Sequence, residues 1–320
     1  MEYQEAADNF KNYLIGRNYS DRTIDTYLSY TNMFFSFMKK NYARIKSFEK
    51  VTKNVIRDYQ NYLMNYTDKA GNALSNKTQN LKLISVKQFF QFLKQNDLIL
   101  KNPTDDIVFA KEEDKIIRNI LTVDETFKLI NNIKLKNPVS IRNRAIIETV
   151  YSCGIRTSEL CRLLINDVDL KMQTVTIVKG KGGKSRICPL TQYATEYIDL
   201  YLKKGRKYML KGKKHDPGFL FLTKYGNAFT KNTINRTVIE SVTRNLGLKK
   251  HISMYSFRHG LATQLIASDV DITYVAKLLG HKNLRTTQKY TRIEISDLKK
   301  VHSLYHPREA KQNREINPVN

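Results

Sequence analysis

The stretch that decides the fold lies between His251 and Tyr290. It opens with His251-Ile-Ser-Met-Tyr-Ser-Phe-Arg-His-Gly260 and closes with Leu278-Leu-Gly-His-Lys-Asn-Leu-Arg-Thr-Thr-Gln-Lys-Tyr290. The spacing of apolar residues between Gly260 and Leu279 predicts one helix. Its apolar face would carry Ala262, Leu265, Ile266, Val275, Leu278 and Leu279. Gly280 is placed to end this helix in the left-handed conformation that glycine adopts freely.

Polar residues follow the predicted helix directly. His281 would lie on the turn after the helix, and Thr286 or Thr287 can cap a short helix that carries Tyr290. A turn followed by a short helix would bring His281 and Tyr290 to one pocket. We expect Arg258, near the start of the stretch, to be buried.

A second informative stretch is Tyr151-Ser-Cys-Gly-Ile-Arg-Thr-Ser-Glu-Leu160. Gly154 permits a break in the chain, and the next helix, capped by Thr157 or Ser158, would run through Leu160, Leu163 and Leu164. Arg156 then lies at a helix N-terminus, where anions bind favourably. Judged alone, Arg156 is more often a structural residue, paired with Glu159 or Asp167, than a catalytic one.

The segment after Asp169 predicts a β-hairpin. Residues 174–178 alternate in polarity, a turn rich in glycine and lysine follows, and residues 186–190 return. The basic side chains at the predicted tip, which could hold phosphate groups, are Lys179, Lys181, Lys184 and Arg186. Gly183-Lys184-Ser185 matches the end of a nucleotide-binding P-loop. The glycine required five positions earlier is Val178, however, and no helix start follows, so we exclude an ATP site.

Residues 1–100 predict about four helices around an aromatic core. A turn at residues 16–20 separates the first two, and Ser20 caps the second. The third runs from Val51 to Asn65 with Thr52 as its cap, and the fourth covers residues 77–94. The other face of the fourth helix carries Lys82 and Lys87. A small helical bundle with a basic face is suited to docking into a groove of duplex DNA.

The remaining segments predict a second helical domain. Residues 109–118 read as an interdomain linker, and Thr122 then caps a helix over 123–133. Further helices are predicted over residues 140–152, 192–209, 230–245 and 295–304, and a short buried segment over 219–222. Polar residues of the helix over 230–245 are available to DNA or are simply solvated, namely Asn232, Thr233 and Arg236. The polar end, residues 307–320, is predicted to be flexible.

Composition favours a nucleic-acid partner. A chain of 320 residues suggests two domains, and its net charge of +25 attracts polyanions. No apolar run approaches the roughly 18 residues of a membrane span, and the N-terminus is unlike a signal peptide. The three cysteines form neither a disulfide framework nor a metal-binding spacing, which favours a reducing compartment.

Several separated motifs resemble the tyrosine recombinases, the phage integrase family, in its Xer branch. They are Arg258-His259, the Leu-Leu-Gly-His of 278–281, the Thr-Thr-Gln-Lys-Tyr-Thr of 286–291, the Gly-Ile-Arg-Thr-Ser-Glu-Leu of 154–160 and the Leu-Thr-x-x-Glu of 121–125. The resemblance covers nearly the whole chain and implies a mainly α fold with a small β-sheet (α+β). It implies a helical core-binding domain (1–108), a linker (109–118), a catalytic domain (119–306) and a flexible tail (307–320). A C-terminal exchange helix at about 295–304 would pack on a neighbouring subunit.

The resemblance also implies roles for single residues. Tyr290 would be the nucleophile, and Arg156 and Arg258 would hold the scissile phosphate. Lys181 would protonate the leaving 5′-oxygen, and His281 would donate to a phosphate oxygen. The residues implied as supports are Glu159, Asp167 and His259. Neither a metal nor a cofactor is expected, because a phosphotyrosine intermediate retains the energy of the phosphodiester.

One position departs from the family pattern. The family usually has histidine three residues before the second arginine, and this chain has Tyr255. A tyrosine hydroxyl can donate a hydrogen bond to a phosphate oxygen. It serves less readily than imidazole as a base near neutral pH, so slower cleavage or a different base is an open alternative.

The implied activity is site-specific recombination through a 3′-phosphotyrosine and a Holliday junction, in mobile-element integration and excision or in dimer resolution. The implied partner is double-stranded DNA with inverted-repeat half-sites, bound by a homotetramer on two duplexes, with an accessory or directionality protein as a further candidate. No membrane partner is expected, and the expected location is the cytoplasm, on the nucleoid. The alternatives are a catalytically weakened DNA-binding protein of the same fold, a telomere resolvase and a type IB topoisomerase.

Overall fold

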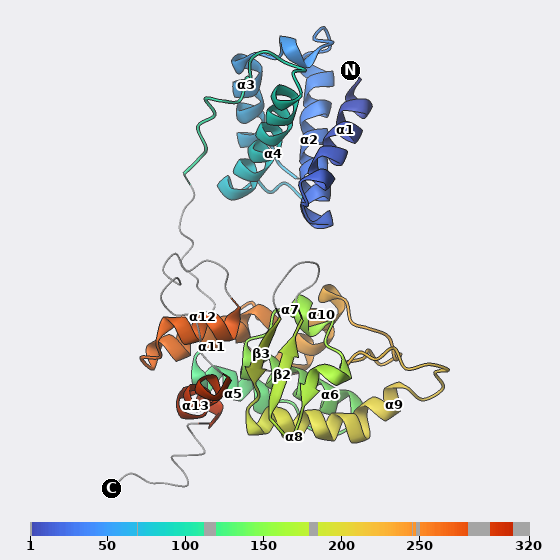
Figure 1. Cartoon of the computed structure of the whole chain (residues 1–320), viewed down its shortest axis with the longest axis vertical. Helices are drawn as coiled ribbons and strands as arrows, with labels where there is room; N and C mark the ends of the chain where they lie inside the picture. The colour runs from blue at the N-terminus through green and yellow to red at the C-terminus, as the bar shows by residue number, and fades with distance from the viewer. Residues whose placement is uncertain are drawn as a thin grey trace. The chain divides into compact units, whose positions relative to one another are not determined.

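The computed structural model describes residues 2–68, 70–111, 120–178, 185–244, 246–247, 250–280 and 295–309. The chain divides into two compact units, Met1–Ile116 and Ile117–Asn320, and each has its own hydrophobic core. Figure 1 shows that helices dominate both units. The predicted fold class, mainly helical with one small sheet, is confirmed. Several predicted site residues lie outside the described residues, namely Lys179, Lys181, Lys184, His281 and Tyr290.

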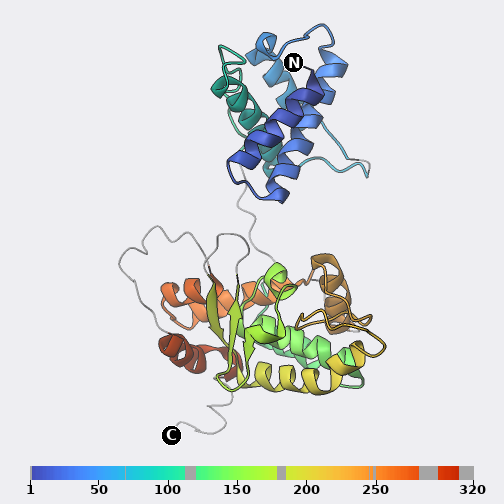
Figure 2. The same ribbon diagram turned by 45° about the vertical axis from the view of Figure 1, so that its right-hand side comes forward.

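The first unit is a bundle of four helices. They are α1 (Tyr3–Gly16), α2 (Asp21–Asn41), α3 (Lys53–Met64) and α4 (Asn76–Gln95), with a 3-10 turn, η1 (Phe48–Lys50), between α2 and α3. Helix α4 packs against the other three helices (Figure 2). Ser20 and Ser75 cap α2 and α4 by accepting backbone N–H bonds of 3.3 Å. The predicted cap of α2 is thereby confirmed, whereas Thr52 precedes α3 without a side-chain cap bond.

Aromatic rings fill the core of the first unit. The ring of Phe89 lies 5.1 Å from the rings of Phe35 and Phe48 and 5.5 Å from those of Phe10 and Phe90, centroid to centroid. These edge-on contacts suit the quadrupoles of the rings. The aromatic residues are therefore core residues, as the sequence predicted.

Lys82 does not lie on an exposed basic face. Lys82 is only 8% exposed, and its ammonium group lies 4.3 Å from the ring centroid of Tyr30 on α2. Burial lowers the pKa of Lys82. The prediction that Lys82 and Lys87 share one open face is thus wrong for Lys82, because its side chain packs against Tyr30 and Met33 of α2. Lys87 is partly exposed.

The predicted linker begins too early. The Asn80 side chain donates to the Ala110 carbonyl (2.8 Å) and accepts from the Ala110 N–H (3.0 Å). The Asn76 side chain donates to the carbonyl of Lys111 at 2.9 Å. Residues 109–111 therefore belong to the first unit, because α4 supplies hydrogen-bond partners for their backbone.

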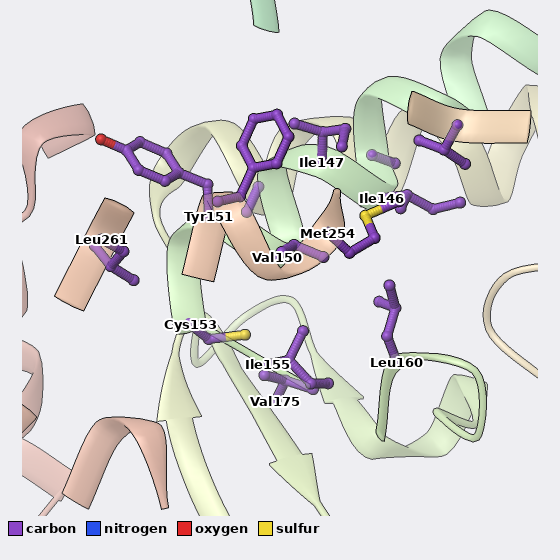
Figure 3. Packing of buried hydrophobic residues seen from close by; sticks show 14 of the residues in the cluster. Ile146, Ile147, Val150, Tyr151, Cys153, Ile155, Leu160, Val175, Met254 and Leu261 are labelled. Carbon is purple, nitrogen blue, oxygen red and sulfur yellow. The ribbon is translucent and has the colours of Figure 1, made fainter. Parts of the chain in front are cut away.

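The second unit packs its helices around α6 (Pro138–Cys153). The elements before the sheet are α5 (Val123–Asn131), α6, the one-turn α7 (Thr157–Leu160) and the 3-10 turn η2 (Ile165–Asp167). Those after it are α8 (Gln192–Leu200), the π-helical η3 (Tyr201–Arg206), α9 (Lys207–Met209), α10 (Lys231–Thr243), α11 (Met254–Ala267), α12 (Ile272–Leu279) and α13 (Ile295–Tyr305). Helix α6 contacts α5, α8, α10 and α11. Figure 3 shows its apolar side chains among those of neighbouring elements, which explains why α6 is buried along most of its length.

The sheet has three antiparallel strands in the order β1-β2-β3. They are β1 (Val168–Asp169), β2 (Thr174–Ile177) and β3 (Arg186–Pro189). Ile177 pairs with Arg186 and Thr174 with Pro189, so the predicted hairpin strands are confirmed. Strand β3 also contacts α6 and α13.

The single helix predicted up to Leu279 is wrong. Two helices, α11 and α12, replace it, and residues 268–271 separate them. Asp269 adopts a left-handed φ of +58°, and the Asp271 side chain accepts the Thr273 N–H at 2.7 Å to cap α12. The short polar side chains thus end one helix and start the next. Ile266, which was predicted on the apolar face of the single helix, is 50% exposed. Gly280, with a φ of +64°, ends α12 as predicted.

Helix α7 is shorter than predicted and begins earlier. Arg156, rather than Thr157 or Ser158, is its N-terminal cap residue, and the helix ends at Leu160. The chain then turns away because the Leu163 carbonyl accepts the Leu220 N–H at 2.7 Å. These backbone bonds to a distant segment stop the helix that the leucine spacing predicts.

Residues 295–309 dock onto the rest of the second unit. Helix α13 contacts β3 and α12 of its own unit, and the buried Arg308 side chain bonds the Glu148 carboxylate of α6 at 2.6 Å. The predicted flexibility is therefore wrong for residues 307–309, and residues 310–320 lie outside the described part of the chain. In that described part, no helix is long and apolar enough to cross a membrane.

Candidate active site

Two arginines from distant parts of the sequence meet at the C-terminal end of α12. The Arg156 guanidinium donates to the Gly280 carbonyl at 2.9 Å. The Arg258 guanidinium, from α11, donates to the Leu279 carbonyl at 2.9 Å and to the Gly154 carbonyl. Both side chains are therefore oriented by backbone oxygens. The carbonyls of the last helical turn are free to accept them, because they have no partner within the helix.

Gly154 brings Arg156 to this place. It ends α6 with a φ of +57°, a conformation in which a residue with a side chain is strained. A Cβ atom at Gly154 would also overlap the Leu279 side chain. Glycine is thus needed twice, once for the turn and once for the close approach of that turn to α12.

Glu159 links the site to the sheet. Its carboxylate accepts from the Arg156 Nη1 (3.0 Å) and from both terminal nitrogens of Arg186 (3.0 and 2.8 Å). Burial opposes ionisation of Glu159, but the hydrogen bonds and charges of Arg186 and Arg156 outweigh it and lower the pKa to about 2. Glu159 therefore carries its negative charge at neutral pH.

Arg186 does not lie at an exposed hairpin tip. Its side chain is 10% exposed, and its Nε donates to the Leu278 carbonyl at 3.2 Å. The prediction of an exposed DNA-contacting Arg186 is wrong, because β3 places this side chain between Glu159 and the end of α12.

A pocket of about 380 Å³ opens beside the two arginines. Basic and aromatic side chains line it, namely Arg156, Lys231, Tyr255, Arg258 and His259, together with Ile155, Thr157, Ser158, Met254, Ala262 and Leu279. Burial, together with the charges of Arg156 and Arg186, lowers the pKa of Arg258 to about 10. Arg258 is still protonated at neutral pH, so the pocket offers a concentration of positive charge suited to a phosphate group.

Lys231 is the pocket residue that the sequence analysis missed. It is the first residue of α10, directly after the cap Thr230. The only signal in the sequence was its position next to the predicted DNA contacts Asn232, Thr233 and Arg236. Asn232 and Arg236 are exposed, and the Thr233 hydroxyl lies 2.9 Å from the Thr230 hydroxyl within the cap of α10.

Tyr255 and His259 form a stacked pair at the pocket wall. Their ring centroids are 5.7 Å apart and the rings are nearly parallel, at 9°. Tyr255 is 62% exposed, so its hydroxyl is free to reach a ligand. Within the described residues the buried Nε2 of His259 has no hydrogen-bond partner.

Asp167 plays a local role. Its carboxylate accepts the Leu164 N–H at 2.8 Å, which holds the η2 turn before β1. This bond explains the residue without any contact to the arginines, so the structure supports Glu159, rather than Asp167, as the carboxylate of the site.

The described residues show no metal site. No cluster of three or more histidine, cysteine, aspartate or glutamate side chains occurs among them. The three cysteines are free thiols, and burial raises the pKa of Cys161 and Cys188 to about 11. Both are therefore protonated and unreactive at neutral pH.

Comparison with known families matches both units. Residues 119–296 match the Phage integrase family, and residues 7–97 match the Phage integrase, N-terminal SAM-like domain. The chain is 34% identical to tyrosine recombinase XerC of Bacillus licheniformis, over 95% of this chain and 99% of the relative. It is 33% identical to tyrosine recombinase XerC of Bacillus subtilis (95% and 97%) and 30% identical to tyrosine recombinase XerD of Oceanobacillus iheyensis (96% and 99%).

Solved structures share the fold. A XerH site-specific recombinase bound to a palindromic difH substrate, in a post-cleavage complex, matches with a TM-score of 0.65 and 24% identity. That match covers 90% of this chain and 81% of the other. A lambda integrase (75–356) dimer bound to a COC′ core site also has a TM-score of 0.65, with 18% identity over 92% and 100% of the two chains.

Proposed function

This chain belongs to the phage integrase family, and we propose from that premise how its residues cleave and rejoin DNA. It is a tyrosine-type site-specific recombinase, an enzyme that transfers DNA strands. Double-stranded DNA is its substrate, and the net charge of +25 provides the long-range attraction for a polyanion. The activity follows from the family.

The observation that carries the mechanism is the meeting of Arg156 and Arg258 at one pocket. Each guanidinium can donate to several partners at once, and the bonds to the Gly280, Leu279 and Gly154 carbonyls and to Glu159 hold both groups at the pocket wall. From there the two guanidinium groups can bind the non-bridging oxygens of a phosphodiester in the pocket. Because the carbonyls already orient both side chains, little reorganisation is needed when charge develops on those oxygens.

The covalent step uses residues outside the described part of the chain. The Tyr290 phenolate attacks the phosphorus, the bond to the 5′-oxygen breaks, and Lys181 gives that oxygen a proton. The product is a 3′-phosphotyrosine, from which a 5′-hydroxyl of the partner strand later displaces the tyrosine to rejoin DNA. A phenol of pKa about 10 needs a positive field to act at neutral pH, and the arginine pair, with His281, supplies it.

Tyr255 takes the place of the usual histidine as a hydrogen-bond donor. Its exposed hydroxyl lies in the wall of the same pocket, and stacking on His259 limits the positions of its ring. A neutral donor stabilises a phosphate oxygen without taking up a proton. The imidazole of His259, which stacks on the tyrosine and lines the same pocket, is the group that would act as a base.

The assembly proposed here is a homotetramer on two duplexes, each with inverted half-sites, which exchanges strands through a Holliday junction. The first unit would act as the core-binding domain, within residues 1–108, with Lys87 among its contacts. In the catalytic domain, 119–306, Lys179, Lys184, Asn232 and Arg236 are further candidate contacts to phosphates. The enzyme would work on the nucleoid, with an accessory protein as a further candidate partner.

A nicked suicide substrate tests the mechanism. The full chain is incubated with its native site, sought among inverted repeats near its gene, and a covalent DNA adduct is looked for on a denaturing gel. We expect an adduct with the wild type and none with Tyr290→Phe. The matched control is Tyr225→Phe, which alters an exposed tyrosine of the same unit and should leave the adduct unchanged.

Two results would contradict the proposal. An adduct that persists in Tyr290→Phe would exclude that residue as the nucleophile. Tight, salt-dependent binding of the site without any adduct in the wild type would instead indicate a DNA-binding protein that has lost cleavage.

A further inference from the structure

Three arginines, not two, hold the C-terminal end of α12. Arg186 donates to the carbonyl of Leu278, Arg258 to that of Leu279 and Arg156 to that of Gly280. These are consecutive carbonyl oxygens at the negative end of the helix dipole, where positive charge is favourable. The arrangement sets the position of α12 immediately before His281.

Arg186 also binds the Glu159 carboxylate with more side-chain hydrogen bonds than Arg156 does. Its two terminal nitrogens bond both carboxylate oxygens, at 3.0 and 2.8 Å. Arg156 reaches the same carboxylate with one guanidinium nitrogen, at 3.0 Å, and with its backbone N–H, at 3.0 Å. A carboxylate bound in this two-pronged way has one preferred partner, and here that partner is Arg186.

The two arginines differ in their access to solvent. The Arg156 side chain is 37% exposed and lines the pocket. Arg186 is nearly buried, and the described residues that line the pocket do not include it. Arg186 therefore acts on a bound phosphate only through its neighbours.

The backbone is also fitted to Arg186. A Cβ atom at Gly280 would lie 2.9 to 3.1 Å from three atoms of the Arg186 side chain. A residue other than glycine would thus displace the guanidinium, in addition to being strained at a φ of +64°. The Gly280 backbone and the Arg186 side chain are therefore closely packed.

We propose that Arg186 is a positioning residue for DNA cleavage: by binding Glu159 with both terminal nitrogens, it prevents that carboxylate from neutralising Arg156. Without Arg186, Glu159 is free to form a two-pronged pair with Arg156. That pair would break the hydrogen bond between the Arg156 guanidinium and the Gly280 carbonyl. It would also neutralise the positive charge of Arg156 that stabilises the scissile phosphate. The inference rests on the function proposed above.

The test measures DNA affinity and single-turnover cleavage of the suicide substrate by the full chain. For Arg186→Gln we expect cleavage to slow by about 100-fold while the Kd for DNA changes by less than about threefold. Arg186→Lys keeps the charge but loses the two-pronged geometry, and should slow cleavage by about tenfold. The double variant Arg186→Gln with Glu159→Gln should recover to within about tenfold of the wild type, since the competing carboxylate is gone.

A matched control separates positioning from stability. Arg206 is also a buried arginine of this unit that bonds both oxygens of one carboxylate, Asp216, and a backbone carbonyl, that of Phe219. It is not among the pocket residues that the structure describes. Arg206→Gln should lower the Tm as Arg186→Gln does, but cleavage per folded molecule should stay at the wild-type rate.

Two outcomes would overturn the inference. One is cleavage by Arg186→Gln as fast as by Arg206→Gln, and the other is a double variant slower than Arg186→Gln alone. The proposed function fails separately, through an adduct in Tyr290→Phe. If the wild type forms its adduct through Tyr290 and the Arg186 variants cleave normally, only the positioning role of Arg186 is contradicted.

Discussion

The two units of this protein are stabilised by different means. The first unit buries mostly aromatic and aliphatic side chains, and Lys82 is the one charged side chain buried among its described residues. The second unit encloses many charged or titratable groups in the part of the chain that the structure describes. They are Arg142, Arg144, Glu148, Glu159, Arg206, Arg258, His302, His306 and Arg308.

The difference follows from what each unit must do. Apolar burial is non-directional and contributes about 25 cal/mol per Å², so a core of rings stabilises a bundle without setting the direction of any one polar group. A buried charge costs desolvation energy and is tolerated only with well-placed partners. Those same partners fix the orientation of the charged group. The second unit therefore gains precise placement of its arginines in exchange for a core that is easily disrupted by removing one partner.

A second charged cluster shows the same logic away from the pocket. The buried Glu148 carboxylate accepts from Arg144 (2.9 Å) and from Arg308 (2.6 Å). Beside it, the rings of His302 and His306 lie 4.5 Å apart, and His302 Nε2 donates to the Ser152 carbonyl at 2.8 Å. This cluster ties residues 302–308 to α6, the helix that leads to Arg156.

The largest effect should come from removing a ring from the first unit. Phe89→Ala leaves a cavity among five phenylalanine rings and should lower the free energy of unfolding of that unit by about 4 kcal/mol. Amide hydrogen exchange, followed peptide by peptide, should show faster exchange in residues 2–111 and unchanged exchange in the second unit. Leu100→Ala, at a highly exposed position, is the control and should change neither. Equal loss of protection in both units would show that they do not unfold independently.

Breaking the second charged cluster should cost slightly less and act on the other unit. Glu148→Gln leaves Arg144 and Arg308 buried without their carboxylate, which should lower the free energy of unfolding of the second unit by about 3 kcal/mol. Exchange should rise in α6 and α13 while the first unit stays protected. Glu240→Gln, an exposed change on α10, is the matched control. A Glu148→Gln protein as stable as the control would contradict the contrast between the two cores.

The smallest effect per group should come from acid, and it should be confined to the second unit. Burial lowers the pKa of His302 to about 4, and burial with the neighbouring His302 lowers that of His306. The unfolded chain binds these protons below about pH 6.5, whereas the folded unit binds them only in stronger acid. Stability is therefore complete above pH 6.5 and falls on acidification, by about 2 kcal/mol for His302 between pH 7 and 5, with His306 adding to the loss.

The first unit contains no histidine, so it is the internal reference for this pH dependence. Urea unfolding of the two units, each followed by its own peptides at pH 7 and pH 5, measures the difference. The loss of stability of the second unit between pH 7 and pH 5 should be smaller in His302→Gln. It should be unchanged in His215→Gln, which alters an exposed histidine. A first unit that loses as much stability as the second would rule out the histidines as the cause.

Local signals in the sequence were sufficient for much of the fold. Ser20 and Thr122 were predicted as caps, and each accepts the backbone bond expected of it. Gly280 was predicted to end a helix and does so with a left-handed φ. Such features depend on residues within three or four positions of each other, so distant segments contribute little to their energies.

The errors fall where distant segments compete with local preference. The leucine spacing after Arg156 predicts a longer helix, but the Leu220 N–H takes the Leu163 carbonyl and the helix ends. A lysine-rich helix face suggested an open Lys82, but the Tyr30 ring on another helix covers it. Lys231 was missed because nothing near it in sequence reveals that α10 begins beside the pocket.

The sequence by itself determined the helical class, the hairpin, the caps Ser20 and Thr122 and the chemical types needed for the site, because each depends on residue spacing or on motifs of a few residues. Only the tertiary structure decided what the charged side chains touch. Arg186 looked like a surface contact and instead binds Glu159 and the end of α12. Ion pairs and carbonyl contacts form between whichever groups the packed chain brings within about 3 Å, and no local pattern encodes that distance.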